Sequence, residues 1–365
     1  MDPVLLAATL GLLALGLVMV FSAGSTVGRQ YFGDSYYFIK RQALWAVVGL
    51  GLLWFFSRVD YHVYRRWAWP AVSVALVLLV LVLFIGQELG GTRGWISIGF
   101  FHVQPLEVAK LAMILMLASH FDQARHNLKR FRVFLLPVLV LGLMVGLIML
   151  QPDFGGVLVL AGASVVTLFA SGTSVLYILV LGSAALPAFV YLAVAEPYRM
   201  ERLLAFFNPW KDPQDTGYQI IQSLLAIGSG GLFGVGLGQS RQKFSYLPAS
   251  QTDFIFAIIG EEMGLLGTLL VLGLFFLFIW RGFRIALRAP DYFGTLLGCG
   301  LTSLIGFQAL MNIGVISGVL PVTGITLPLI SYGGSSLAIT LAAIGILLNL
   351  SRQVNEVGSG PRRAT

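Results

Sequence analysis

Long apolar runs separated by shorter polar segments recur along the whole chain. A helix that crosses a bilayer needs about 20 predominantly apolar residues, and the runs are of this order of length. The pattern predicts an all-α polytopic membrane protein with about ten transmembrane helices. The expected spans are residues 4–22, 42–57, 67–86, 105–121, 133–150, 154–170, 174–195, 253–280, 294–317 and 335–350.

The polar segments divide the chain into one membrane domain, residues 1–350, and a cytoplasmic tail, residues 351–365. If the N-terminus is cytoplasmic, most Lys and Arg residues of the short connections lie on the cytoplasmic side, as the positive-inside rule requires. Both termini are therefore expected in the cytoplasm. The long connection at 196–250 is then extracytoplasmic, and a connection of this length in a compact protein is usually functional.

The composition supports the membrane interpretation and excludes several others. The 365 residues are 57% hydrophobic and 11% charged, whereas soluble domains carry about 25% charged residues. The net charge of +7 lies in short clusters between apolar runs, which is typical of a topology signal and argues against a nucleic-acid surface. Cys299 is the single cysteine, so intrachain disulfides are excluded. The four histidines lack the spacing of metal ligands.

Charged residues inside the apolar runs are few, and they are candidates for function because they are costly in a bilayer. Glu107 and Lys110 are three residues apart on the fourth expected span, so they share a helix face and can pair. A structural ion pair and a catalytic pair fit this spacing equally well. Asp153 comes directly before an apolar run, where we expect it to cap the following helix. It could also face Lys110 across the bundle.

Asp253 is the strongest candidate for a catalytic carboxylate. It begins the eighth expected span, where burial raises a carboxylate pKa and cationic neighbours such as Arg241 and Lys243 lower it. We expect a general base balanced by these opposing effects. The alternative is that Asp253 caps its helix. Glu261 lies about 12 Å further along the helix and Glu262 points to the opposite face, so neither can share a proton with Asp253.

Two further segments have informative patterns. Apolar residues at 220, 221, 224, 225 and 227 recur at helical spacing, which predicts either a half-helix at the membrane surface or a helix packed on the outer ends of the spans. Residues 320–336 are rich in Pro and Gly, and irregular backbone at this depth has to be covered by protein or line a wet cavity. The Gly-rich run at 234–238 has no surrounding βαβ unit, so a nucleotide-binding loop is excluded.

Three sets of spaced motifs extend over nearly the whole chain. The first is Gly91-Thr92-Arg93-Gly94-Trp95 with Gln104-Pro105-Leu106-Glu107-Val108-Ala109-Lys110. The second comprises Gly217-Tyr218-Gln219, Gly230-Gly231-Leu232-Phe233-Gly234, Thr252-Asp253-Phe254 and Gly260-Glu261-Glu262. The third is Leu320-Pro321-Val322-Thr323-Gly324 with Ser331-Tyr332-Gly333-Gly334-Ser335-Ser336. Together they resemble the SEDS family (shape, elongation, division and sporulation), the polytopic peptidoglycan glycosyltransferases that include FtsW, RodA and SpoVE.

Details within the motifs refine the resemblance. Residues 32–42 and 236–243 are more similar to the division protein FtsW and the sporulation protein SpoVE than to RodA, and of the two we favour FtsW. Leu106 stands where the family usually has a small residue. Ala249-Ser250-Gln251 replaces an acidic residue and a His that commonly precede the Thr-Asp pair, which weakens any proton-transfer role for those two residues here.

The resemblance implies polymerisation of lipid II, the undecaprenyl-pyrophosphate-linked disaccharide peptide, on the outer face of the bacterial cytoplasmic membrane, for septal wall synthesis. Within this hypothesis Asp253 is the general base, and the supporting charged site is Glu107, Lys110, Asp153 and Glu261. Cations would stabilise the departing pyrophosphate, and a divalent cation, Mg²⁺ or Mn²⁺, could contribute. The candidate pyrophosphate ligands are Arg93, Arg199, Arg202, Arg241 and Lys243.

The implied partners are lipid II, a class B penicillin-binding protein that cross-links the glycan, other membrane proteins of the divisome or elongasome, and membrane lipids. Alternative functions are a lipid II flippase, a RodA-type polymerase of the elongation machinery, and a non-catalytic scaffold. A flippase needs polar groups along a continuous path, whereas Asp153, Asp253 and the basic long connection gather at the outer side. We therefore favour the polymerase.

Overall fold

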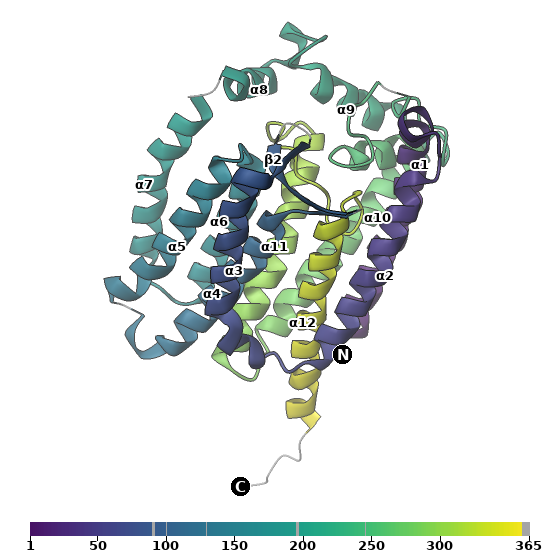
Figure 1. Ribbon diagram of the computed structural model, residues 1–365. Coiled ribbons are helices and arrows are strands. Elements are labelled where there is room, and N and C mark those ends of the chain that lie inside the picture. The colour runs from purple at the N-terminus through teal and green to yellow at the C-terminus, as the bar shows by residue number, and fades with distance from the viewer. Residues whose placement is uncertain (90–91, 100, 129, 195–196, 245, 360–365) are drawn as a thin grey trace.

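The computed structural model describes residues 1–89, 92–99, 101–128, 130–194, 197–244 and 246–359. A helix lies at each of the ten ranges expected from the apolar pattern, and these helices form one elongated bundle (Figure 1). They are α1 (Pro3–Phe32), α2 (Tyr37–Arg58), α3 (Val63–Ile85), α4 (Pro105–Gln123), α5 (Phe131–Met149), α6 (Phe154–Ala170), α7 (Val175–Val194), α10 (Ile255–Ala286), α11 (Tyr292–Ile316) and α12 (Gly334–Ser359).

Several of these helices could cross a membrane, which confirms a polytopic membrane protein. Within the described residues, seven helices are long and apolar enough to do so: α1, α2, α3, α5, α10, α11 and α12. The helices α6 and α7 are apolar over shorter stretches. The helix α4 carries three charged residues in its 19 positions, Glu107, Lys110 and Asp122.

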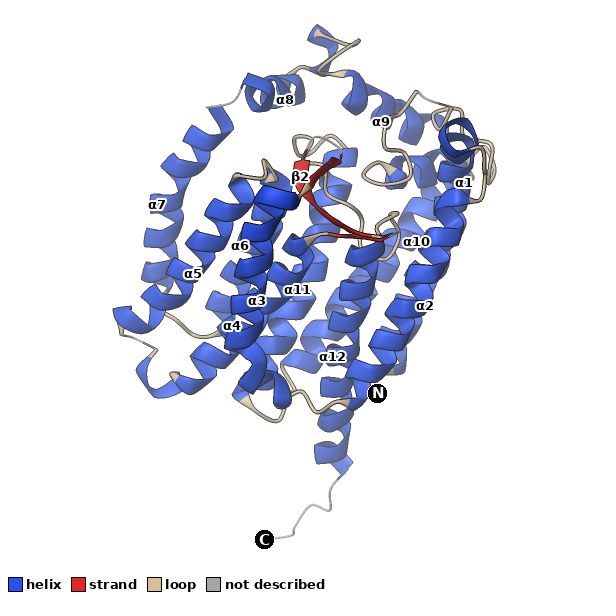
Figure 2. Ribbon diagram, viewed as in Figure 1, coloured by secondary structure: helices blue, strands red, loops and turns tan. Residues whose placement is uncertain are grey.

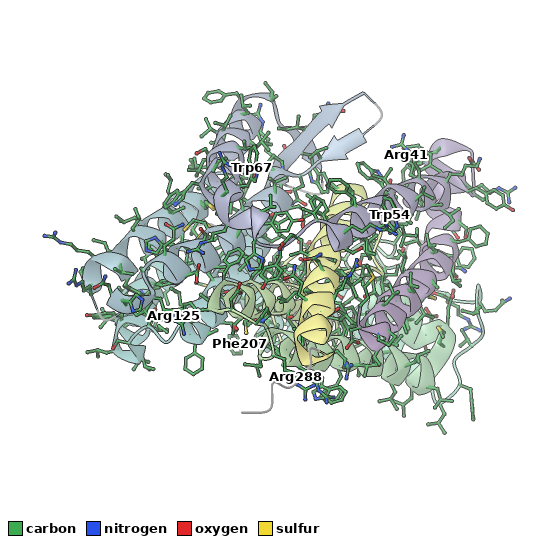
Figure 3. All side chains as sticks on the ribbon, turned by 90° about the horizontal axis from the view of Figure 1, so that it is seen from below. Arg41, Trp54, Trp67, Arg125, Phe207 and Arg288 are labelled. Atoms are coloured by element: carbon green, nitrogen blue, oxygen red, sulfur yellow. The ribbon has the colours of Figure 1, made fainter. Side chains whose placement is uncertain are left out.

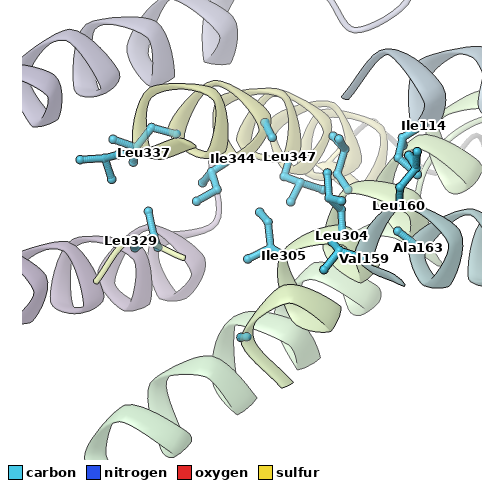
Figure 4. Packing of buried hydrophobic residues seen from close by; sticks show 14 of the residues in the cluster. Ile114, Val159, Leu160, Ala163, Leu304, Ile305, Leu329, Leu337, Ile344 and Leu347 are labelled. Carbon is cyan, nitrogen blue, oxygen red and sulfur yellow. The ribbon is translucent and has the colours of Figure 1, made fainter. Parts of the chain in front are cut away.

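The centre of the bundle is formed by α11 and α12. Their most apolar windows are 72% and 89% buried, compared with 28 to 44% for the other five candidate spans. Side chains such as Ile305, Ile344 and Leu347 pack together between these helices (Figure 4). At the periphery, Trp54 and Trp67 are exposed and point outward, as expected for residues that face lipid (Figure 3).

The protein is helical as predicted, and a small antiparallel sheet between α3 and α4 is an addition that the sequence did not predict. It consists of β1 (Gln87–Leu89), β2 (Thr92–Ile98) and β3 (Phe101–Val103), in the order β1-β2-β3 (Figure 2). The strands contain Thr, Trp, Ile, Phe and Val, which favour extended backbone. Gly99 has a φ of +61° between β2 and β3 and so allows the tight turn that joins them.

The long connection contains three further helical elements, α8 (Pro197–Phe207), η2 (Pro209–Lys211) and α9 (Tyr218–Ser229), and η1 (Arg125–Asn127) joins α4 to α5. The helix α9 contains the residues whose spacing predicted a helix. It packs on α10 and α11, and the Ser223 hydroxyl donates to the carbonyl of Ile316 over 2.8 Å. Of the two interpretations of this segment, the structure supports the helix packed on the ends of other helices. The sequence did not predict α8.

The helix α10 is interrupted, although one continuous span was predicted there. Gly264 has φ 64° and ψ −159°, so the backbone leaves the helical conformation at that residue. Downstream of the break, Leu265 and Leu266 donate their N–H groups to the carbonyls of Gly231 and Leu232, over 2.9 and 3.2 Å. The loop after α9 therefore supplies acceptors that the interrupted helix lacks.

Candidate active site

Asp253 lies in a turn, residues 249–254, directly before α10. Asn312 of α11 donates to the carbonyl of Asp253 over 2.7 Å. Tyr332 donates its N–H to the carbonyl of Gln251 over 2.9 Å, and the Ser331 hydroxyl donates to the carbonyl of Thr252 over 2.5 Å. Residues 327–331 of the irregular segment are buried, residues 320–326 are partly exposed, and the hydrogen bonds of Ser331 and Tyr332 fix the backbone of this turn.

The Asp253 carboxylate does not cap α10. The N-cap residue is Phe254, and no side chain caps this helix, so the alternative interpretation of Asp253 as a cap is wrong. The carboxylate is half-buried, and no hydrogen bond within the described part of the chain involves it. Its Oδ2 atom lies beside Gly324, 3.8 Å from the position that a Cβ would occupy there. Its oxygens therefore have no hydrogen-bond donor among the described residues.

Asp153 caps α6, as predicted. Its Oδ1 accepts the N–H of Gly156 over 2.8 Å, and Gln104, directly before α4, donates to Oδ2 over 3.3 Å. Burial raises the pKa of Asp153, opposed by the Gly156 hydrogen bond and by the charge of Lys110. Lys110 was expected to face Asp153, and its positive charge does act on the Asp153 carboxylate.

The charge of Asp153 acts on Asp253, which the sequence did not predict. Burial is the main cause that raises the pKa of Asp253 to about 6, and the negative charge of Asp153 raises it further. The positive charge of Arg202 on α8 lowers it. A carboxyl with a pKa of about 6 is ionised at neutral pH and binds a proton more readily than an ordinary aspartate. The start of α6 and the turn before α10 both lie beside residues 323–325. A Cβ at Gly155 would be 2.5 Å from the carbonyl oxygen of Thr323, and Asp253 Oδ2 lies beside Gly324.

Glu107 and Lys110 form the predicted ion pair. Lys110 Nζ lies 2.8 Å from Glu107 Oε1, and both side chains are buried. Lys110 also donates to Gln308 Oε1 of α11 over 2.8 Å, and Gln308 in turn donates to the carbonyl of Thr326 over 3.2 Å. The pair therefore connects α4 to α11 and to the irregular segment that supports Asp253.

Glu261 and Lys243 lie elsewhere, in a second cluster of buried charges. Glu261 accepts hydrogen bonds from the Ser240 hydroxyl and from the N–H of Arg241 at 2.8 Å. Lys243 Nζ lies 3.2 Å from Glu262 Oε1, and both side chains are buried. The prediction that Lys243 flanks Asp253 is wrong, because its ammonium is bound in this cluster. No hydrogen bond joins either glutamate to Asp253 among the described residues, which agrees with the expectation that neither shares a proton with it.

The other candidate cations are spread over the same end of the protein. Arg93 is exposed on β2, and its Nε donates to the carbonyl of Gly86 over 3.0 Å. Arg241 is exposed in the loop before α10, and Arg202 is exposed on α8. The side chain of Arg199, also on α8, lies outside the described residues. Among the cations with described side chains, Arg202 is the one whose charge acts on Asp253.

No group of three or more His, Cys, Asp or Glu side chains that could hold a metal ion occurs among the described residues. Asp153 and Asp253 are two described carboxylates at this end, and the charge of Asp153 acts on Asp253. Magnesium is commonly held by one or two carboxylates together with substrate phosphates. The donor set therefore fits a cation that arrives with a pyrophosphate substrate.

Comparison with known proteins identifies the family. A family model described as "Cell cycle protein", covering FtsW, RodA and SpoVE, matches residues 3–356. The chain belongs to the FtsW/RodA/SpoVE family. The predicted family, and with it the class of peptidoglycan glycosyltransferases, is confirmed.

Relatives and solved structures agree with this membership over nearly the whole chain. Stage V sporulation protein E of Bacillus subtilis is 48% identical over 354 residues, 96% of this chain and 97% of that protein. A probable peptidoglycan glycosyltransferase FtsW of Trichlorobacter lovleyi is 44% identical, covering 96% of this chain and 93% of the relative. The relatives of this FtsW/RodA/SpoVE protein therefore include both a SpoVE protein and an FtsW protein.

Two solved structures have the same fold. One, described as "Structural coordination of polymerization and crosslinking by a peptidoglycan synthase complex", has a TM-score of 0.80 and 36% identity, covering 97% of this chain and 98% of that chain. The crystal structure of the rod shape determining protein RodA of Thermus thermophilus has a TM-score of 0.72 and 33% identity. The match covers 96% of this chain and 97% of that chain.

Proposed function

We propose that this chain polymerises lipid II into glycan strands, with release of undecaprenyl pyrophosphate, and that Asp253 is the general base. The proposal rests on the environment of the Asp253 carboxylate. The carboxylate has no hydrogen bond to other described residues, and its pKa of about 6 suits proton transfer near neutral pH.

The reaction follows from this placement. The 4-hydroxyl of one sugar attacks the anomeric carbon of another, the new C–O bond forms as the bond to the pyrophosphate breaks, and the configuration inverts. Asp253 accepts the hydroxyl proton, and the electron pair leaves with the pyrophosphate. A positioned base contributes roughly 10²- to 10⁴-fold to such a step. Burial, with a further contribution from the negative charge of Asp153, raises the pKa of Asp253 and so favours its acceptance of this proton.

Positive charge near the leaving group completes the proposed mechanism. Arg202 is the preferred pyrophosphate ligand, because its charge reaches Asp253. Arg93, Arg199 and Arg241 are secondary candidates. Lys243 is not assigned to the pyrophosphate, since Glu262 binds its ammonium. A divalent cation, if bound by Asp153 and the substrate pyrophosphate, would supply additional charge to the leaving group.

The proposed setting is the bacterial cytoplasmic membrane, with ten spans, cytoplasmic termini and the active site outside. Asp153, Asp253 and the long connection lie at the same end of the bundle (Figure 1). A cysteine at Gln214, in a chain whose buried Cys299 is replaced by Ser, should react with an impermeant reagent added to whole cells. A cysteine at Asn127, at the other end, should be protected. The reverse labelling pattern would invert the topology.

The proposed partner is a class B penicillin-binding protein, with further divisome membrane proteins in septal wall synthesis. Two observations support it: a similar fold occurs in a peptidoglycan synthase complex, and FtsW proteins are among the relatives. An elongation role of the RodA type is the alternative. The exposed apolar side chains around the bundle would contact membrane lipids and the tail of lipid II.

Purified protein, with and without the partner, tests the polymerase directly when it is given labelled lipid II in vesicles. Asp253→Asn should lower the rate of glycan formation at least about a hundredfold. Asp215 is an exposed aspartate of the long connection, and Asp215→Asn should form glycan at the rate of the unmodified protein. Polymer formed equally well by Asp253→Asn would remove Asp253 from the role of base. Lipid II translocation without any polymer would favour the flippase.

A further inference from the structure

The loop from α9 to α10, residues 230–254, carries Asp253 next to its last residue and is bound to the break in α10. Val235 and Gly236 donate their N–H groups to the carbonyls of Glu261 and Glu262, over 3.0 and 3.1 Å. A Cβ at Gly234 would lie 2.2 Å from the carbonyl oxygen of Glu262. The first part of the loop is therefore in backbone contact with α10, and Gly234 has to be a glycine.

Two buried carboxylates bind the middle of the same loop. Glu261 accepts hydrogen bonds from the Ser240 hydroxyl and from the N–H of Arg241, as described above. Glu262 accepts the N–H of Ser240 over 3.2 Å and the ammonium of Lys243 over 3.2 Å. Lys243 also donates to the carbonyl of Gly238 over 2.6 Å. The glutamates thus hold residues 238–243 in a fixed conformation, because each carboxylate has several donors on the loop.

The Glu262 carboxylate also reaches a second helix. The Ser22 hydroxyl of α1 donates to it, at 2.7 Å from Oε1 and 2.6 Å from Oε2, and Lys243 Nζ lies 3.4 Å from the same hydroxyl. Glu262 has 1% of its surface exposed. Three segments that are distant in sequence, namely α1, the loop and the first part of α10, therefore meet at one carboxylate.

We propose that Glu262, held by Ser22 and Lys243, is a positioning residue for the reaction: it fixes the loop that precedes Asp253 and so sets where the Asp253 carboxylate lies. This inference rests on the proposed role of Asp253. Glu262 does not touch the substrate in this proposal. The turn at 249–254 has its own anchors on Asn312 and Ser331, so loss of Glu262 binding should displace Asp253 partially and reduce the rate without abolishing it.

Ser22→Ala and Ser25→Ala form a matched pair that tests the proposal. Ser22 donates to Glu262, whereas the Ser25 hydroxyl donates to the carbonyl of Ser22 within α1. Ser22→Ala should lower kcat for glycan formation about three- to tenfold, with KM for lipid II changed less than twofold. Ser25→Ala should leave kcat unchanged. Glu262→Gln combined with Lys243→Met, which removes both charges of the pair, should lower kcat at least as much as Ser22→Ala.

The pH profile separates positioning from a purely structural role. The charged groups that act on Asp253 are Asp153 and Arg202. If Ser22→Ala lets Asp253 move away from Asp153 and towards water, the acid limb of the rate profile should move to lower pH. Loss of folded protein alone would lower the rate at every pH and leave the limb in place, and that result would overturn the inference.

Asp253→Asn in the same preparation distinguishes the two proposals. If Asp253→Asn is inactive and Ser22→Ala matches Ser25→Ala in kcat and pH profile, only the positioning role is overturned. If Asp253→Asn keeps full activity, the proposed base is wrong, whatever Ser22→Ala does.

Discussion

Asp253 and Glu262 lie close together in the sequence, yet their carboxylates are in opposite situations. Glu262 is fully buried and accepts hydrogen bonds from Ser22, Ser240 and Lys243. Asp253 is half-buried, faces the negative charge of Asp153, and has no hydrogen bond to its side chain among the described residues. A satisfied carboxylate fixes structure, whereas one left without donors keeps the capacity to bind a proton. Glu262 therefore has a structural role, whereas Asp253 is suited to proton transfer.

Removing the cation from the satisfied carboxylate should have the largest effect on stability. Lys243→Met leaves Glu262 buried without its counter-charge, and breaking a buried ion pair in this way costs about 3–5 kcal/mol. We expect a large fall in the thermal midpoint of the purified protein. Adding Glu262→Gln should restore part of the loss, because the double variant is neutral. Lys211→Met, at an exposed lysine of η2, is the control, and an equal midpoint for both single variants would contradict this account of the cluster.

The positions of most helices could be predicted from the sequence, because spans of about 20 apolar residues are unambiguous. The sheet at 87–103 could not, since strands of three and seven residues leave no periodic pattern between long apolar runs. The break at Gly264 was also hidden. A single glycine inside an apolar run is compatible with a continuous helix, and only its φ of +64° reveals the interruption.

The candidate site was predictable one residue at a time, but not as an arrangement. Asp253 was identified from its place at the start of a span, and Glu107 and Lys110 from local helical spacing. Asp153 and Asp253 are far apart in sequence, so their interaction depends on how α6 packs beside the turn before α10. Lys243 seemed close to Asp253 along the chain, but the loop folds back and places it on Glu262.

Asp253→Asn should stabilise the protein, the opposite of the effect at Lys243. The pKa of Asp253 is about 6 in the folded protein and 3.8 for an ordinary aspartate, so the folded state binds the proton more tightly. The ionised carboxylate therefore lowers the free energy of unfolding. This loss is complete above pH 6 and becomes smaller as the pH falls towards 4. After allowance for its partial exposure we expect a gain of about 1–2 kcal/mol at pH 7.5. Thermal unfolding at pH 7.5 and pH 5 measures it, and a midpoint below that of the unmodified protein at pH 7.5 would contradict it.

Asp153→Asn should sharpen the contrast by changing the charge that acts on Asp253. Asparagine is also a good N-cap, so α6 should keep its cap. Without the negative charge the pKa of Asp253 falls, and the acid limb of kcat/KM should move from about pH 6 to lower pH by roughly half to one unit. A limb that stays in place would show that the two carboxylates do not interact.

Arg202→Gln should give the smallest effect, and in the opposite direction. The positive charge of Arg202 lowers the pKa of Asp253, so its removal should move the acid limb to higher pH by about a few tenths of a unit, and more at low ionic strength because solvent-exposed charges are screened by salt. Arg241→Gln, another exposed arginine of the same region, should leave the limb unchanged. Equal shifts for the two variants would mean that Asp253 responds to the overall positive charge of the long connection. A shift specific to Arg202 would place α8 over the reacting carboxylate, and would make Arg202 the first of the cations to test for pyrophosphate binding.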